Sequence, residues 1–170
     1  MQKLNKLKAI SIAFFLVFSM IASLSLTPNV VAHYPAWDIP TYAFINVSPN
    51  PVGLGQTANV VVWLDKIPDG ALITNNIRFH NYKCVITAPD GPTKTITWET
   101  VTDTTSSAYS PFTPDQVGKY TLNFSFPGQK YTDYTHNANS QFVNDTYLPS
   151  SATTTLTVQE EPIPSTEVTP

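Results

Sequence analysis

The 170-residue chain has a single cysteine and few basic residues, and both shortages narrow what it can do. Because Cys84 has no partner in the chain, the fold cannot contain an internal disulfide and must hold without one. Cys84 alternates with Tyr82 and Ile86 in a strand-like run, which predicts a small buried hydrophobic residue and not a reactive thiol. No pattern of nucleophile and base is visible, so we expect no enzyme.

Charge is also scarce, with nine Lys and Arg against twelve Asp and Glu. Three of the basic residues, Lys3, Lys6 and Lys8, lie at the amino end of the chain. Without them, six basic residues remain against twelve acidic ones, a net charge of −6. A surface of this sign offers no basic patch that could displace counterions from phosphates, so nucleic acid is excluded as an expected partner.

The first 32 residues have the pattern of an export signal. The three lysines precede an apolar run over residues 9–26, Pro28 ends the run, and Val30-Val31-Ala32 offers the small residues that a signal peptidase reads. We therefore expect a signal peptide at 1–32, a mature protein that begins at His33, and an extracellular or cell-surface location. In the alternative, the run is retained as a membrane anchor, although its roughly 18 residues are at the short limit for a span.

Sustained helical spacing is absent after the signal, and runs of Val, Ile, Thr, Tyr and Phe closed by Pro, Gly, Asn or Asp take its place. They predict one all-β domain over residues 33–158, with strands at 41–48, 57–65, 78–88, 93–101, 107–112, 121–126 and 152–158. Trp63 lies in a stretch that is apolar on both faces, which predicts a central strand covered on two sides. Residues 159–170 are rich in Pro, Glu and Thr and predict an extended linker or tail.

Gly118 and Tyr120, at the entry to the strand 121–126, resemble the tyrosine corner of immunoglobulin-like and fibronectin type III domains. The resemblance implies an antiparallel β-sandwich of about seven strands, in which the Tyr120 hydroxyl bonds to an upstream carbonyl. Leu122 stands where a disulfide-bonded immunoglobulin domain has its second cysteine. This departure argues against the antibody-type subfamily and leaves the sandwich intact.

Longer blocks resemble the amino-terminal region of archaeal exported proteins of the PQQ-binding-like β-propeller repeat family. These blocks are His33–Ala43, Val47–Gln56, Phe79–Lys83, Tyr109–Tyr120, Phe124–Gly128 and Leu156–Pro162. In that family a propeller follows the Pro-rich linker, which implies that the present domain stands in front of a downstream domain. The 170 residues contain no propeller repeat, so quinone binding and dehydrogenase activity do not carry over.

Three N-x-S/T sequons predict N-glycosylation at Asn46, Asn123 and Asn144. Asn46 and Asn123 alternate with the apolar residues of their strands, so both are expected on outward faces. Pro49 directly follows the first sequon and disfavours it, which leaves Asn123 and Asn144 as the favoured positions.

The three histidines are candidate metal ligands. In an immunoglobulin-like sandwich the amino terminus, the loop between the second and third strands and the loop before the last strand meet at one pole, where His33, His80 and His136 would gather. An amino-terminal histidine can bind copper through its amine and imidazole, with a second histidine completing a brace. The alternative treats all three as ordinary strand or loop residues, and on that interpretation we expect no cofactor.

A tyrosine-rich segment between residues 131 and 147 is the other candidate site, with Tyr131, Tyr134, His136 and Tyr147 as its ligand-binding residues. Tyrosines on a loop held by a rigid scaffold bind proteins or sugars, although they can instead pack on the end of the sandwich. The sequence thus predicts a non-enzymatic surface module that binds a surface protein or a glycan. The alternatives are a copper protein or oxidative enzyme using His33, and a carbohydrate-binding module.

Overall fold

The computed structural model describes residues 8, 10–19, 32–132 and 140–164, and it divides the chain into two units, Met1–Val31 and Ala32–Pro170. In the first unit, residues 10–19 are helical, and side chains such as Phe14, Phe15 and Phe18 are exposed. Among the described residues, no helix has both the length and the hydropathy needed to cross a membrane.

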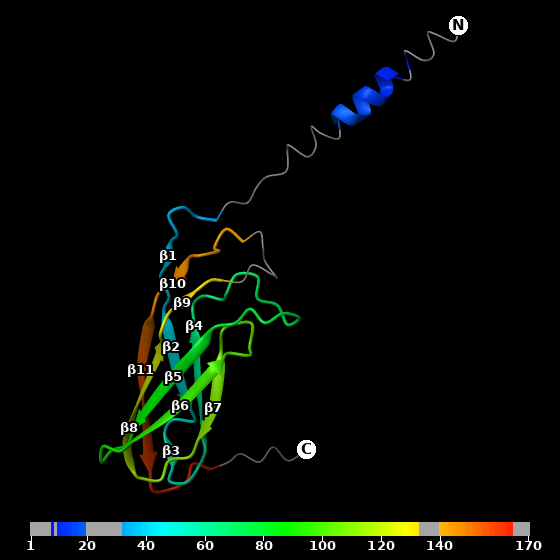
Figure 1. Ribbon diagram of the computed structural model, residues 1–170. Helices are drawn as coiled ribbons and strands as arrows, with labels where there is room; N and C mark the ends of the chain where they lie inside the picture. The colour runs from blue at the N-terminus through cyan, green and yellow to red at the C-terminus, as the bar shows by residue number, and fades with distance from the viewer. Residues whose placement is uncertain (1–7, 9, 20–31, 133–139, 165–170) are drawn as a thin grey trace, which may run out of the picture. The chain divides into compact units, whose positions relative to one another are not determined.

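The second unit is built from strands (Figure 1). They are β1 (Asp38–Ile39), β2 (Ala43–Ser48), β3 (Val52–Gly53), β4 (Ala58–Leu64), β5 (His80–Thr87), β6 (Thr93–Thr100), β7 (Ala108–Phe112), β8 (Gly118–Phe126), β9 (Gln129–Lys130), β10 (Thr146–Tyr147) and β11 (Ser150–Gln159). One sheet has the order β3-β11-β8-β5-β6, a second β2-β4-β7, and a small third sheet β1-β10-β9. Neighbours are antiparallel except for the pairs β3 with β11 and β1 with β10.

The two larger sheets form the sandwich, which confirms the predicted all-β class. The first, second and fifth strands of an immunoglobulin-like domain share one sheet, and the third, sixth and seventh share the other. Here β2, β4 and β7 stand in the first set, whereas β5, β8 and β11 stand in the second. The short β3 continues β2 across to the opposite sheet, where it pairs in parallel with the last strand.

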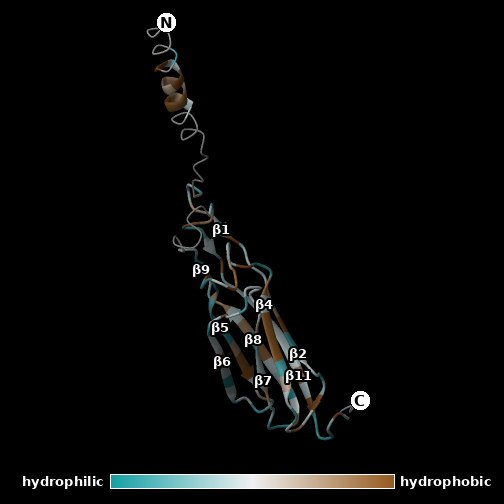
Figure 2. Cartoon of the chain, turned by 90° about the vertical axis from the view of Figure 1, so that its right-hand side faces the viewer, coloured by the Kyte–Doolittle hydropathy of each residue, from teal (hydrophilic) through white to brown (hydrophobic). Residues whose placement is uncertain are grey.

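The core arises from the period-two alternation of these strands. On β8, Tyr120, Leu122, Phe124 and Phe126 are buried, while the residues between them point outward, as predicted. The opposing β4 buries Ala58, Val60, Val62 and Leu64. In Figure 2 the ribbon of β4 is largely brown, whereas the edge strand β6, whose residues are mostly exposed, is white and teal.

Strand β5 contributes the centre of this core. Tyr82 is fully buried, its ring lies 5.1 Å from that of Phe124 between centroids, and its hydroxyl donates to the Ser106 carbonyl at 3.2 Å. Cys84 is also fully buried, and burial raises the pKa of its thiol to about 11. Cys84 is thus a buried core residue, as its alternation with Tyr82 and Ile86 predicts.

Trp63 differs from its prediction. The second face of β4 is not covered, because Val61 and Trp63 remain partly exposed on the outside of the three-stranded sheet. The Trp63 ring stacks on that of Phe44 from β2, with centroids 5.4 Å apart and an interplanar angle of 9°. One face of this apolar strand therefore packs in the core, and the other presents Val61 and Trp63 on the outside of the sheet.

Tyr120 forms the predicted corner with a different acceptor. Its hydroxyl accepts a hydrogen bond from the Gln116 backbone N–H at 2.9 Å and donates to the Asp115 carboxylate at 2.9 Å. The predicted acceptor was a backbone carbonyl, and a side-chain oxygen takes that place. Burial is the largest cause that raises the pKa of Tyr120, and the hydrogen bond to Asp115 is the second.

Residues after β11 remain attached to the domain. The Gln56 side chain accepts from the Ile163 N–H at 2.9 Å and donates to the Ile163 carbonyl at 3.0 Å. Leu54 N–H also donates to the Gln159 carbonyl at 2.8 Å. The first residues of the predicted linker therefore leave the sandwich along a fixed path.

Gly118 should not tolerate a side chain. Its φ is +132°, and an added Cβ would lie 2.8 Å from Pro89 Cγ. Because a strained backbone costs about 1–3 kcal/mol, we expect Gly118→Ala to lower the free energy of unfolding by at least that amount in denaturant titration. Gly91→Ala is the matched control, since its φ is +105° but nothing lies within 4 Å. Equal losses for the two variants would contradict the clash with Pro89.

Candidate functional site

A buried carboxylate organises the pole at which the second unit begins. Asp145 is fully buried, and its two carboxylate oxygens lie 2.6 Å from His33 Nδ1 and 2.8 Å from the Trp37 backbone N, which donates to it. The His33 ring also stacks on Trp37, with centroids 3.4 Å apart and an interplanar angle of 9°. Because an ionised carboxylate only accepts hydrogen bonds, Nδ1 is the protonated ring nitrogen in this arrangement.

The small sheet brings these residues together. Strand β1 pairs in parallel with β10, so the residue before β1 and the residue before β10 become neighbours. Thr146 N–H donates to the Trp37 carbonyl at 2.9 Å and Leu148 N–H to the Ile39 carbonyl at 2.8 Å. Trp37 and Asp145, 108 positions apart in sequence, are therefore held by backbone hydrogen bonds on both sides.

This geometry bears on the proposed copper brace. Both His33 groups that a brace would use have protein partners, since Nδ1 contacts Asp145 and the backbone N–H donates to the Gln141 carbonyl at 3.1 Å. His80 Nδ1 lies 3.1 Å from the Glu99 carbonyl oxygen, and His136 lies outside the described residues. Within residues 32–132 and 140–164, no three His, Cys, Asp or Glu side chains form a metal-binding group. Copper would have to displace Asp145 from His33.

The tyrosine-rich segment packs inward where it is described. Tyr131 and Tyr147 are 3% and 4% exposed. The Tyr131 hydroxyl donates to the Asp69 carbonyl at 2.8 Å, and the Tyr147 hydroxyl accepts from the Asp69 N–H at 3.2 Å. This corrects the prediction of a contact surface at these two positions, because both hydroxyls fasten the loop after β4. Tyr134 and His136 lie outside the described residues.

Sequence reasoning did not single out Asp145, although a signal was present. Val143, Asp145 and Tyr147 alternate, and all three are buried. A carboxylate that takes the place of an apolar residue in an alternating run indicates a buried hydrogen-bond acceptor. Burying a carboxylate without hydrogen-bond partners would cost free energy. Asp69 plays a related part in the neighbouring loop, where its carboxylate accepts from the Ser140 hydroxyl at 2.6 Å.

The sequon asparagines are all exposed. Asn46 lies on the outer face of β2 and Asn123 on the outer face of β8, as predicted from their alternation. Asn144 lies in the turn before Asp145 with a φ of +76°. Each is reachable by a transferase, and glycan occupancy stays a prediction.

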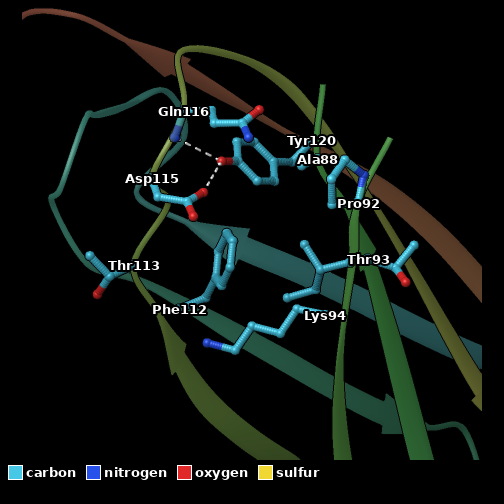
Figure 3. Close-up of a pocket in the computed structure, with 10 residues that line it drawn as sticks. Ala88, Pro92, Thr93, Lys94, Phe112, Thr113, Asp115, Gln116 and Tyr120 are labelled. Carbon is cyan, nitrogen blue, oxygen red and sulfur yellow. Dashed lines mark hydrogen bonds between the residues drawn. The ribbon is translucent and has the colours of Figure 1, made fainter. Parts of the chain in front are cut away.

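A cavity of about 190 Å³ opens beside the tyrosine corner (Figure 3). Asp115, Gln116 and the Tyr120 hydroxyl form one wall, and Lys94 lies across from them with its Nζ 5.7 Å from the centre of the Phe112 ring. Sites for drug-sized ligands usually measure about 300–1,000 Å³, so this hollow is too small for a ligand of that size.

Comparison with protein-family models, curated proteins and solved structures gives no match to this chain. The resemblance to the exported propeller proteins therefore stays a prediction.

Removing the Asp145 carboxylate should loosen the pole. Asp145→Ala leaves two partly buried donors, on His33 and Trp37, without their acceptor, and hydrogen bonds to charged groups contribute about 1.5–3 kcal/mol each. We expect a loss of about 3 kcal/mol in the free energy of unfolding, measured by denaturant titration. Asp38→Ala, an exposed carboxylate two positions before Pro40, is the control. Indistinguishable stabilities for the two variants would refute the anchoring role of Asp145.

Alkaline pH should destabilise the domain through its buried phenols. Burial raises the pKa of Tyr147 from 10.0 to about 12, and burial also raises that of Tyr82. A raised folded-state pKa means that the stabilisation is complete below pH 10.0 and is lost as pH climbs towards about 12. We expect phenolate absorbance to rise in two stages, the second coinciding with unfolding by circular dichroism. A single stage near pH 10.0 involving all eight tyrosines of a folded chain would contradict this.

Proposed function

We propose that this chain is an exported, cell-surface immunoglobulin-like module that acts as a spacer and interaction domain, and that it is not an enzyme. The observation that carries the proposal is the placement of the two ends of the folded unit. His33 lies with the small sheet β1-β10-β9 at one pole, and the residues after β11 leave beside β3 at the other (Figure 1). Because the chain enters this rigid domain at one pole and leaves it at the other, the domain holds the segments before and after it apart.

Both ends are fastened, which a spacer requires. The Gln56 side chain holds Ile163 through two hydrogen bonds, so the exit direction of the tail is set by the domain. At the opposite pole, Asp145 holds His33 and Trp37. These contacts support a module that transmits a fixed orientation to a downstream segment.

The site around His33 also favours processing at the predicted position. Cleavage after Ala32 would turn the His33 backbone nitrogen into an ammonium group, which keeps its donor role towards the Gln141 carbonyl. The new positive charge would belong to a residue that already contacts the buried Asp145 carboxylate, and opposite charges in a partly buried setting attract. The mature terminus would therefore fit the pole at least as well as the uncut chain.

Export and processing can be measured directly. The full chain is expressed in a host with a general secretory pathway, and the exported protein is analysed by intact mass. We expect a mass that starts at His33, with any glycans at Asn123 and Asn144 visible as additions. Ala32→Lys, which removes the small residue before the cut, should retain the leader, whereas Ala36→Lys should be processed normally. Full-length protein confined to the cytoplasm would overturn the proposal.

A further inference from the structure

The two outer faces of the sandwich have opposite chemistry. On the five-stranded sheet, a row of threonines crosses four strands in register. The row is Thr93, Thr87, Thr121 and Thr155. The other outward residues of β5 and β8 include Lys83, Lys119, Val85, Asn123 and Ser125. The outer face of the three-stranded sheet instead carries aromatic rings and contains no charged residue among its outward positions on β2, β4 and β7. These positions are Phe44, Asn46, Ser48, Asn59, Val61, Trp63, Tyr109 and Pro111.

The rings on this aromatic face are accessible and fixed by the strands. Phe44 is 43% exposed and stacks on Trp63, its partner in register on β4. Val61 lies between Asn46 on one side and Tyr109 on the other, and Tyr109 is 72% exposed. Amide and hydroxyl groups therefore alternate with apolar surface across three adjacent strands.

The aromatic face continues into a groove at its β7 edge. Tyr109 is also part of a hollow of about 240 Å³, whose other walls include Trp98, Thr100 and Ser107. Trp98 Nε1 donates to the Tyr109 carbonyl oxygen at 3.1 Å, which ties the edge of β6 to that of β7. Asp103, the one charged residue of this lining, already accepts two hydrogen bonds from Thr105.

We propose that the aromatic face and this groove bind a neutral polysaccharide chain. The flat C–H faces of sugar rings pack on aromatic rings, and sugar hydroxyls pair with amides and hydroxyls such as those of Asn46, Asn59 and Ser48. An uncharged surface on a chain whose net charge is −6 after residue 32 suits an uncharged ligand and disfavours an anionic one. Because these residues lie on strands, binding does not require a loop to be ordered.

The size of the face argues against a second copy of the chain as its occupant. Three strands about 4.8 Å apart and about six residues long present roughly 300 Å². A stable protein interface buries about 800 Å² on each partner. The face is therefore large enough for a few sugar rings, and a lasting dimer would have to bury surface beyond these three strands as well. This assignment deepens the proposed surface module and rests on it.

The test is affinity electrophoresis of the mature chain in gels containing hydroxyethyl cellulose, xylan, galactomannan or the polyanion polygalacturonate. The protein is made without N-glycosylation, since Asn46 lies on the aromatic face, and its mass is verified. We expect retardation by at least one neutral polymer and none by the polyanion. Trp63→Ala and Tyr109→Ala should each weaken binding about tenfold, because a lost aromatic contact of about 1.4 kcal/mol corresponds to that factor.

Thr95→Ala and Thr153→Ala, on the opposite outer face, are the matched controls and should bind as the parent does. Trp63→Phe should retain most of the affinity, and thermal melting verifies that each variant is folded. Absence of retardation by every neutral polymer, or equal retardation of all variants, would overturn the assignment. A concentration-dependent dimer that Trp63→Ala abolishes would also overturn the assignment, because the face would then be a contact between two copies of the chain. Export measured by intact mass is independent of these outcomes, so failure of the proposed function would be recognised separately.

Discussion

The packing of the two larger sheets on one shared apolar core is the interaction on which the rest of the structure depends. With one cysteine, the chain has no covalent link between its sheets, and Leu122 occupies the centre of the strand where related sandwiches place a disulfide. Each fully buried aliphatic or aromatic side chain contributes about 1.5–3 kcal/mol, so the apolar face of β8 supplies what a cross-link would. Both poles are built from the ends of this strand, through Tyr120 at its start and Phe126 at its end.

Much of this core could be predicted, because period-two alternation states directly which face of a strand is buried. The β8 face and the burial of Cys84 were inferred from that alternation, and the tyrosine corner from Gly118 and Tyr120. The two-residue strands β1, β3, β9 and β10 could not be predicted, since two residues carry no periodicity. Trp63 was misplaced for a related reason: apolar residues on both faces of a strand do not reveal whether anything covers the second face.

The contact between His33 and Asp145 could not be predicted from the sequence, for a different reason. His33 and Asp145 are 112 positions apart, and only the pairing of two short strands makes them neighbours. A buried carboxylate is tolerated only when its oxygens are hydrogen-bonded, so this pole cannot close before residues 33 and 37 arrive. The amino terminus of the domain is thereby made part of its folded structure, and a leader could remain only if it left His33 free to reach Asp145.

The described parts of the loops at this pole pack on the domain itself. The hydroxyls of Tyr131 and Tyr147 form hydrogen bonds with the backbone of Asp69, so these two tyrosines are not available to contact a ligand. The outer faces of the two sheets remain exposed, and their backbone is fixed by hydrogen bonds between strands. On one face these side chains are mostly polar and include Lys83 and Lys119, and on the other they include the exposed rings of Phe44 and Tyr109. Contiguous exposed apolar patches on soluble domains mark interaction sites, and this is the physical reason for assigning the proposed ligand to the face that carries the rings.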